Sequence, residues 1–162
     1  MSIDKPTPVG FEPRRLHHWL AFGFGAGLLP RAPGTWGTLA AIPLYLLIAL
    51  FPLPVYVLVT LGLFLVGVWA CGKAGTELGV HDHSAIVWDE VVGYLVALTA
   101  VPSTWQWMLT GFVLFRVFDI LKPWPVGHLD RNLGGGLGVM ADDLAAGLMA
   151  CAVMQLGLMW IG

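Results

Sequence analysis

Charged residues are scarce in this sequence. Asp, Glu, Lys and Arg together make up 11% of the chain, whereas 57% of the residues are hydrophobic and the mean hydropathy is +0.79. A soluble domain has about a quarter of its residues charged, so a water-soluble globule would lack the polar side chains needed to cover its surface. We therefore interpret the chain as an integral membrane protein.

Other absences narrow the interpretation. The only two cysteines, Cys71 and Cys151, stand in apolar surroundings, which is typical of small buried or lipid-facing thiols rather than a disulfide or a metal-binding pair. No run of basic residues indicates nucleic-acid binding. The polar, proline-rich residues 1–15 lack the basic start and apolar run of a cleaved signal peptide. We expect one membrane-embedded domain over residues 1–162 and no partner nucleic acid.

Three stretches contain no charged residue, namely Thr38–Gly72, Val91–Phe115 and Leu144–Gly162. The sequences FPLP (51–54) and VPST (101–104) divide the first two, because proline starts or breaks helices. An all-α bundle of about five transmembrane helices is predicted, each roughly 24–30 Å long and close to the thickness of the hydrocarbon core. The predicted helices are Trp36–Phe51, Val55–Cys71, Ile86–Val101, Trp105–Leu121 and Asp142–Ile161.

The charged residues are confined to one face of this predicted bundle. They lie in the N-terminal segment, in loops 72–88 and 122–142, or at the helix ends beside them. The second loop includes a Gly-Gly-Gly sequence that we interpret as a flexible linker. Because Lys and Arg in short loops mark the cytoplasmic side, we predict that the N-terminus and all polar chemistry face the cytoplasm.

The segment LHHWLAFGFGAGLL (16–29) is apolar enough to suggest a sixth span. It is short, glycine-rich and opens with two histidines. A sixth span would also place Arg31 on the opposite side of the membrane from Arg14 and Arg15. We therefore predict an interfacial or re-entrant segment.

Two acidic doublets indicate a metal site. Asp89 and Glu90 lie in WDEVVG (88–93), and Asp142 and Asp143 lie in MADDLAAG (140–147). Each doublet alone is explained by the preference of carboxylates for helix N-termini. Two doublets at one membrane surface would repel each other unless a cation lay between them, and oxygen donors without thiolates suit Mg²⁺ or Mn²⁺ better than zinc.

The sequence FRVFDILKPWP (115–125) adds cations to the same face. Arg116, Asp119 and Lys122 are three residues apart, so the first two share one side of a helix. A salt bridge with a snorkelling lysine would explain them. Ionisable groups within a span cost about 3 kcal/mol each near the bilayer centre, however. We therefore expect them to face the bundle interior, where Arg and Lys can bind phosphate and Asp can join the metal site.

The loop PRAPGTWGT (30–38) leads into the first predicted helix. It contains Arg31 and the hydroxyls of Thr35 and Thr38. Free backbone N–H groups at a helix start, two hydroxyls and a cation can form an anion cradle, although an ordinary capped helix start uses the same residue types.

Four blocks in this order and spacing resemble the phosphatidylglycerophosphatase A family of bacterial inner-membrane lipid phosphatases. The blocks are GFGAGLLPRAPGTWGTL, WDEVVG, FRVFDILKPWP and MADDLAAG. The resemblance implies that the protein uses Mg²⁺ to hydrolyse phosphatidylglycerophosphate to phosphatidylglycerol and phosphate in the bacterial inner membrane. The Asp-x-Asp-x-Thr and Cys-x5-Arg motifs of other phosphatase classes are absent.

The resemblance and the residues together suggest a role for each polar side chain. The expected metal ligands are Asp89, Glu90, Asp142 and Asp143, holding one or two Mg²⁺ ions that lower the pKa of a bound water. The expected phosphate-binding residues are Arg31, Thr35, Thr38, Arg116 and Lys122. Asp119 either orients Arg116 or completes the metal shell, and an aspartyl-phosphate intermediate on Asp119 or Asp142 is an open variant.

Two other functions would use similar residues. A small transporter for a cation or a phosphorylated solute could use the carboxylates as an ion site, but it would need polar residues along the spans. The outer halves of the predicted helices offer only a few Thr and Tyr residues and Gln155. An intramembrane transferase of the phosphatidyl-alcohol kind would need an acidic motif that the chain lacks. The sequence favours the phosphatase.

Overall fold

The computed structural model describes residues 10–80 and 83–161, and these residues form helices without any strand, as predicted. The elements are α1 (Leu16–Ala21), the 3-10 helix η1 (Gly23–Leu28), α2 (Pro33–Ile48), α3 (Leu53–Leu78), α4 (Trp88–Ala97), α5 (Trp105–Leu121), α6 (Val126–Asn132) and α7 (Gly135–Ile161). The all-α class follows from the apolar composition, because a helix satisfies its backbone polar groups within one segment.

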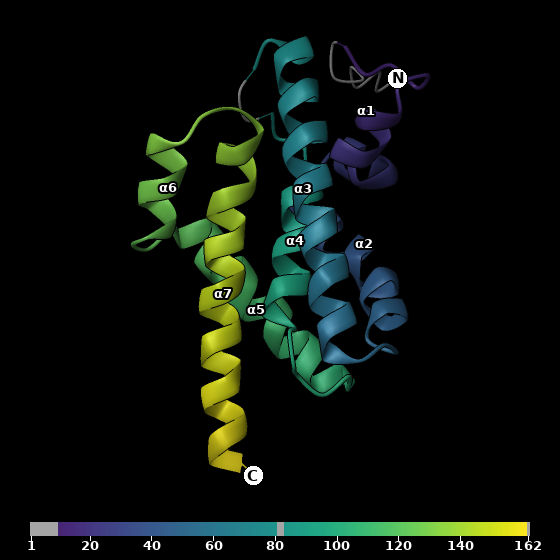
Figure 1. Cartoon of the computed structure of the whole chain (residues 1–162). Coiled ribbons are helices and arrows are strands. Elements are labelled where there is room, and N and C mark those ends of the chain that lie inside the picture. The colour runs from purple at the N-terminus through teal and green to yellow at the C-terminus, as the bar shows by residue number, and fades with distance from the viewer. Residues whose placement is uncertain (1–9, 81–82, 162) are drawn as a thin grey trace, which may run out of the picture.

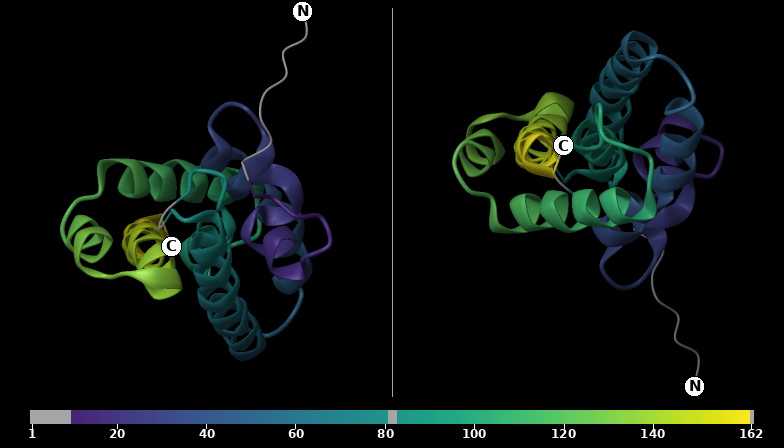
Figure 2. Two further views of the ribbon diagram at one scale, coloured as in Figure 1. Left: turned by 90° about the horizontal axis from the view of Figure 1, so that it is seen from above. Right: turned by 90° about the horizontal axis from the view of Figure 1, so that it is seen from below.

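Helix α4 lies at the centre of the molecule. Every residue of α4 except Glu90 is buried, and α2, α3, α5 and α7 all pack against it. Tyr94 and Leu95 of α4 and Phe115 of α5 are among the largest buried side chains. Helix α7 lies between α6 on one side and α3 with α4 on the other (Figures 1 and 2). The central helix therefore fixes the position of all the longer ones.

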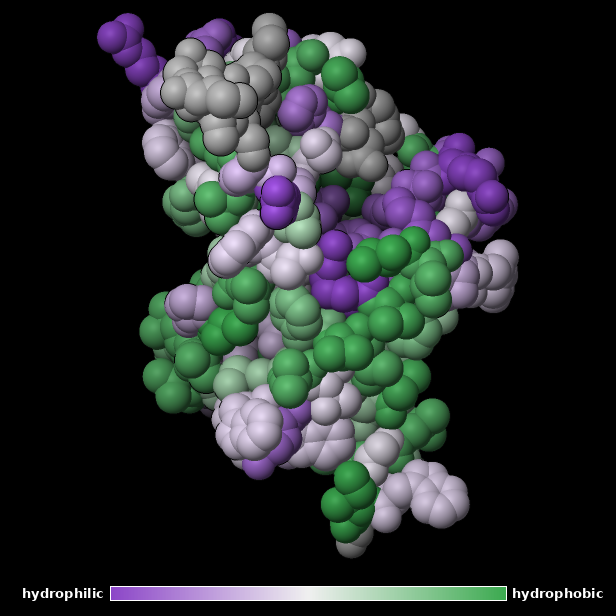
Figure 3. Space-filling view, turned by 180° about the vertical axis from the view of Figure 1, so that it is seen from behind, coloured by the Kyte–Doolittle hydropathy of each residue, from purple (hydrophilic) through white to green (hydrophobic). Residues whose placement is uncertain are grey.

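Two helices, α3 and α7, are long and apolar enough to cross a bilayer. At 1.5 Å per residue each is roughly 40 Å long, longer than the hydrocarbon core. Both carry large exposed apolar side chains, such as Leu58 and Leu156. Hydrophilic side chains gather in the upper part of the face seen in Figure 3, and the lower part is mostly hydrophobic. This distribution suits a protein with one end embedded among lipid chains.

Several predicted helix bounds were wrong. Helix α3 continues beyond Cys71 to Leu78, and α7 begins at Gly135 rather than at Asp142. The interval 122–142, predicted as a loop, contains α6. The central helix is also shorter than predicted and ends at Ala97, so at about 15 Å it is too short to cross a bilayer by itself.

Close packing explains why Gly136 of the Gly-Gly-Gly sequence lies in the first turn of α7 rather than in a flexible linker. A Cβ atom at Gly136 would collide with the carbonyl oxygen of Val68 and would lie 2.8 Å from the backbone nitrogen of Gly72. Only glycine permits this approach of α7 to α3. The glycines therefore bring two backbones together, and the helix begins before the acidic doublet.

The segment 16–29 forms two short helical pieces, α1 and η1, and no spanning helix. The break within η1 occurs at Phe24 and Gly25, whose φ angles are +54° and +98°. Leu16 and Phe24 are both 66% exposed, although α1 packs against α3 and η1 against α2. Exposed apolar residues on a packed segment agree with the interfacial or re-entrant prediction.

Candidate active site

The predicted catalytic residues line a single cavity of about 240 Å³. Its other walls come from the start of α2 with the residue before it, and from the residues before α4. The lining residues are Ala32, Pro33, Gly34, Ser84, Ile86, Asp89, Glu90, Arg116, Asp119, Lys122, Asp142 and Asp143. The structure thus brings together side chains of α4, α5 and α7 that are distant in the sequence.

The acidic doublets reach this cavity by different routes. Asp89 and Glu90 lie in the first turn of α4, where the helix dipole favours carboxylates. Asp142 and Asp143 were also predicted to start a helix, but they lie about two turns inside α7. The doublets meet because α4 and α7 touch through their backbones. A Cβ atom at Gly93 would lie 2.9 Å from the carbonyl oxygen of Asp143.

Three of the four predicted metal ligands form a compact group. Asp89, Glu90 and Asp143 each offer one carboxylate oxygen, and these oxygens lie within 4.8 Å of one another. The fourth, Asp142, instead accepts a hydrogen bond of 2.8 Å from the ammonium group of Lys122. The oxygen-only donor set of the three-residue group is the kind that Mg²⁺ or Mn²⁺ prefers.

Unpaired oxygens show that this group fits a cation. Within the described part of the chain, buried oxygens of Asp89, Glu90, Asp142 and Asp143 have no hydrogen-bond partner. Burying an unpaired carboxylate is costly, and like charges this close repel one another. A hard cation among Asp89, Glu90 and Asp143 would remove both penalties, so the residues present fit the expected metal.

Arg116 connects the carboxylates to α5. Its Nη1 atom donates to the carboxylate of Asp119 and lies 3.8 Å from Oε1 of Glu90. The buried Nε atom has no partner within the described residues. Gly34 lies directly over this pair, because an added Cβ atom would collide with Oε1 of Glu90 and would lie 3.0 Å from Nη1 of Arg116. The guanidinium group thus retains a free donor beside the cavity.

Lys122 ends α5 in a left-handed conformation, with φ of +46°. Its Nζ atom donates to Asp130 at 2.6 Å and to Asp142 at 2.8 Å. Partial burial by itself would lower the pKa of Lys122, but the hydrogen bonds and charges of the two aspartates outweigh it and raise the pKa above its ordinary value. Lys122 therefore carries a positive charge at the cavity wall.

Asp130 was missed by the sequence analysis. It lies in α6, eight residues after Lys122. Two prolines lie between them, so helical spacing could not predict that the two side chains meet. Only the return of α6 toward α7 places its carboxylate against the lysine. Its position within a polar stretch beside Lys122 was the only available signal.

The segment 30–38 contributes differently from the prediction, since α2 already begins at Pro33. Thr38 is buried, and its hydroxyl already donates to the carbonyl oxygen of Gly34 at 2.8 Å. Thr35 is half-buried and does not line the cavity, and Arg31 is exposed beside the cavity wall. The segment lines the cavity with Ala32, Pro33 and Gly34, not with the predicted hydroxyls.

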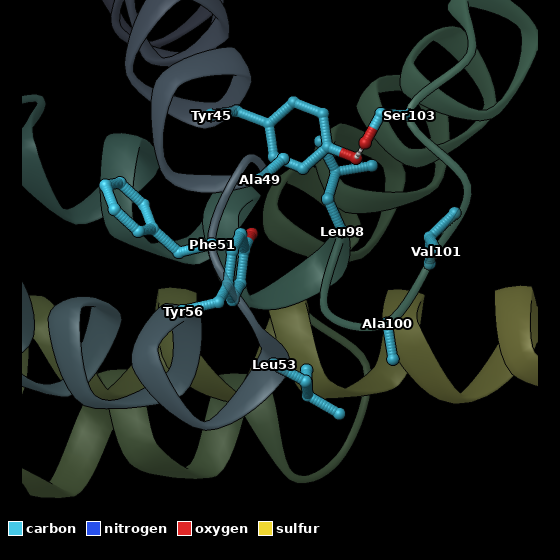
Figure 4. Close-up of a pocket in the computed structure, with 9 residues that line it drawn as sticks. All are labelled: Tyr45, Ala49, Phe51, Leu53, Tyr56, Leu98, Ala100, Val101 and Ser103. Atoms are coloured by element: carbon cyan, nitrogen blue, oxygen red, sulfur yellow. Dashed lines mark hydrogen bonds between the residues drawn. The ribbon is translucent and has the colours of Figure 1, made fainter.

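A second pocket, of about 130 Å³, lies at the opposite end of α4 (Figure 4). Its polar groups are hydroxyls. Tyr45 and Ser103 are 3.0 Å apart through their oxygen atoms, and Tyr56 donates to the carbonyl oxygen of Leu95 at 2.6 Å. None of its lining residues is charged. This pocket therefore has no carboxylate to hold a metal and no cation to neutralise a phosphate.

Comparisons with known proteins agree with the geometry. The family model described as phosphatidylglycerophosphatase A matches residues 19–158. A protein of that name from Escherichia coli K12 is 46% identical over 138 residues, covering 85% of this chain and 80% of the relative. Another from Haemophilus influenzae is 48% identical over 139 residues, covering 85% of each chain.

A more distant relative carries another name. A protein from Bacteroides thetaiotaomicron, provisionally named a phosphatidylinositol-3-phosphatase, is 38% identical over 148 residues, covering 86% of this chain and 92% of the relative. No solved structure gave a significant match.

Proposed function

The chain belongs to the phosphatidylglycerophosphatase A family, and we propose that it uses Mg²⁺ to hydrolyse phosphatidylglycerophosphate at the cytoplasmic face of the membrane. It is a phosphoric monoester hydrolase, as its homologues are named. One observation carries the proposal: three carboxylates with unpaired oxygens share a cavity with Arg116 and Lys122.

Asp89, Glu90 and Asp143 would hold the metal, since they form the compact oxygen group. A bound Mg²⁺ ion supplies positive charge to the phosphate and lowers the pKa of water. The chain itself supplies Arg116, whose free Nε donor can bind a phosphoryl oxygen, and Lys122, whose ammonium group can exchange a carboxylate for phosphate. Both cations stabilise the negative charge of the transition state.

Hydrolysis breaks the bond between phosphorus and the glycerol oxygen, and the leaving oxygen takes a proton. Asp142 is the best-placed carboxylate to accept a proton from the attacking water, because it lines the cavity outside the three-carboxylate group and its Oδ1 atom has no partner among the described residues. Direct attack by Asp142 or Asp119 on phosphorus would give an aspartyl-phosphate instead. Each of these two carboxylates already accepts a hydrogen bond, Asp119 from Arg116 and Asp142 from Lys122.

We further propose a multi-pass bundle of about five membrane-embedded helices, in which the short central helix α4 reaches only part of the way across and the cavity faces the cytoplasm. The polar cavity and the uncharged second pocket at opposite ends of α4 support this orientation. The acyl chains of the substrate would remain in the bilayer while the headgroup enters the cavity. The absence of charged residues around the second pocket argues against the transporter alternative.

The test is phosphate release by purified protein from phosphatidylglycerophosphate, phosphatidic acid and phosphatidylinositol 3-phosphate, with and without Mg²⁺. We expect release to be fastest from phosphatidylglycerophosphate, to stop in excess chelator and to return when Mg²⁺ is restored. Unchanged turnover in excess chelator would contradict the metal role. Faster release from another lipid would contradict the proposed substrate.

A further inference from the structure

A cluster of polar side chains outside the cavity, with two buried histidines around an exposed glutamate, joins the N-terminal segment to the end of α3. The Nε2 atoms of His17 and His18 each lie 2.8 Å from Oε2 of Glu77. Nη1 of Arg15 lies 2.8 Å from the other oxygen, Oε1. The two histidines are only 6% and 1% exposed. Both oxygens of one α3 carboxylate are therefore held by three side chains in or just before α1.

The hydrogen bonding of His18 indicates that this cluster holds α1 against α3, a contact we call the clamp, and does not bind a metal ion. The three side chains His17, His18 and Glu77 could in composition hold a metal ion. The backbone N–H of Glu12, however, donates to Nδ1 of His18 at 2.9 Å. Nδ1 must then be unprotonated, so the neutral ring carries its proton on Nε2 and donates it to Glu77. A metal at Nε2 would require the lone pair that this proton occupies.

The clamped segment also holds the residues before α4. The carbonyl oxygen of Ala21, the last residue of α1, accepts a hydrogen bond of 2.8 Å from the N–H of Val87. A Cβ atom at Gly27 of η1 would collide with the carbonyl oxygen of Ala85, and one at Gly37 of α2 would lie 2.6 Å from Cβ of Val87. Three elements thus contact the backbone at 85–87, directly before Asp89.

We infer that Glu77 is a positioning residue for the active site. Glu77 fixes the position of α1 through its hydrogen bonds with His17 and His18. Helix α1 in turn fixes Val87 through the carbonyl oxygen of Ala21. The position of Val87 then determines where the first turn of α4 places Asp89 and Glu90. The same segment continues through η1 to the cavity wall at residues 32–34. Glu77 itself is absent from the cavity lining. The inference rests on the proposed function, since it concerns the proposed metal-binding carboxylates.

The experiment compares the full-length wild type with Glu77→Leu, Glu77→Asp and the control Thr76→Val. Thr76 is the exposed neighbour of Glu77, and its hydroxyl bonds only to its own helix, at the carbonyl of Gly72. Two quantities are measured: steady-state phosphate release from phosphatidylglycerophosphate, and hydrogen–deuterium exchange of the peptide covering residues 85–90.

For Glu77→Leu we expect faster exchange at 85–90 and a roughly 10- to 100-fold lower kcat with little change in KM, because displaced supporting groups cost about that much. Glu77→Asp should recover most of both, and Thr76→Val should match the wild type. Should Glu77→Leu fail to fold, Arg15→Gln removes one of the contacts to Glu77, together with the ion pair to Glu12, and should shift both readouts in the same direction by less.

Two outcomes would overturn the inference. One is wild-type exchange and kcat in a folded Glu77→Leu protein. The other is stoichiometric zinc in the purified wild type that His18→Ala loses, which would make the cluster a metal site. A wild type that releases no phosphate would instead refute the proposed function, and exchange at 85–90 would still test the clamp.

Discussion

At the scale of single residues, the cavity is organised by shared partners. Lys122 holds two carboxylates at once, and Arg116 binds Asp119 while lying near Glu90. A phosphate entering the cavity must therefore exchange for a carboxylate at Lys122, whereas the buried Nε donor of Arg116 has no partner among the described residues. The two cations are expected to make unequal contributions to binding and to catalysis.

The Lys122 pair yields a graded prediction. Lys122→Ala should lower kcat by roughly 100-fold or more, since removing one donor to a developing charge costs about 10²–10³. Asp130→Asn should cost only about tenfold, because it removes a positioning partner and leaves the ammonium group in place. Phosphate-release kinetics check both, with the exposed neighbour variant Arg131→Ala as the control. Equal activity of Lys122→Ala and the wild type would remove Lys122 from the site.

Gly34 yields a steric prediction. A methyl group there would meet Glu90 and Arg116, so Gly34→Ala should reduce phosphate release strongly while the protein remains folded and inserted. Gly62→Ala is the matched control, because nothing lies within 4 Å of its added Cβ atom. Comparable activity in the two variants would show that the first turn of α2 moves freely away from the ion pair.

At the scale of elements, glycine contacts set how the helices cross. Gly136 of α7 packs on the backbone of α3, and Gly93 of α4 packs beside Asp143 of α7. These approaches bring the acidic doublets of α4 and α7 within reach of each other. The metal group therefore depends on helix–helix contacts that involve no polar side chain.

Gly136→Ala tests this dependence through stability. The added methyl group would collide with the carbonyl oxygen of Val68, a backbone atom that cannot rotate away. We expect destabilisation of about 1–3 kcal/mol, seen as a lower midpoint of thermal unfolding in detergent than for Gly62→Ala. An unchanged midpoint would mean that α3 and α7 can separate there without loss.

At the scale of the whole molecule, charge and apolar surface occupy different ends. Seven charged side chains line the cavity, and the C-terminal part of α7, which has no charged residue, projects beyond its neighbours (Figure 1) with Met159 and Trp160 78% and 91% exposed. In water such exposure would be unfavourable, whereas lipid chains cover it without cost. The family assignment and the two long apolar helices suggest membrane association.

The proposed orientation can be tested by labelling from each side of the membrane. Ser84 lies at the cavity and Ser103 at the second pocket, and both are exposed. In a background with Cys71 and Cys151 replaced, Ser84→Cys should react with an impermeant reagent only from the cytoplasmic side. Ser103→Cys should react only from the opposite side. Reaction of both from the same side would contradict the one-sided arrangement.

The sequence by itself determined the helical class, through its apolar composition and its few charged residues. It also determined that Arg116 and Asp119 share one side of a helix, because residues three apart on a helix are neighbours whatever surrounds them. The family resemblance was likewise visible in the sequence, because it depends only on the order and spacing of the four blocks. The acidic doublets could be recognised as a set for the same reason, since each is contiguous in the chain.

Only the tertiary structure decided which groups meet across the molecule. It directed Asp142 to Lys122 rather than to the other carboxylates, brought Asp130 to the same lysine, and joined Glu77 to the two histidines. It also began α7 seven residues before Asp142, at Gly135. The physical reason is that these contacts depend on how closely and at what angle helices cross, which the packing of glycines and large side chains sets and local periodicity does not.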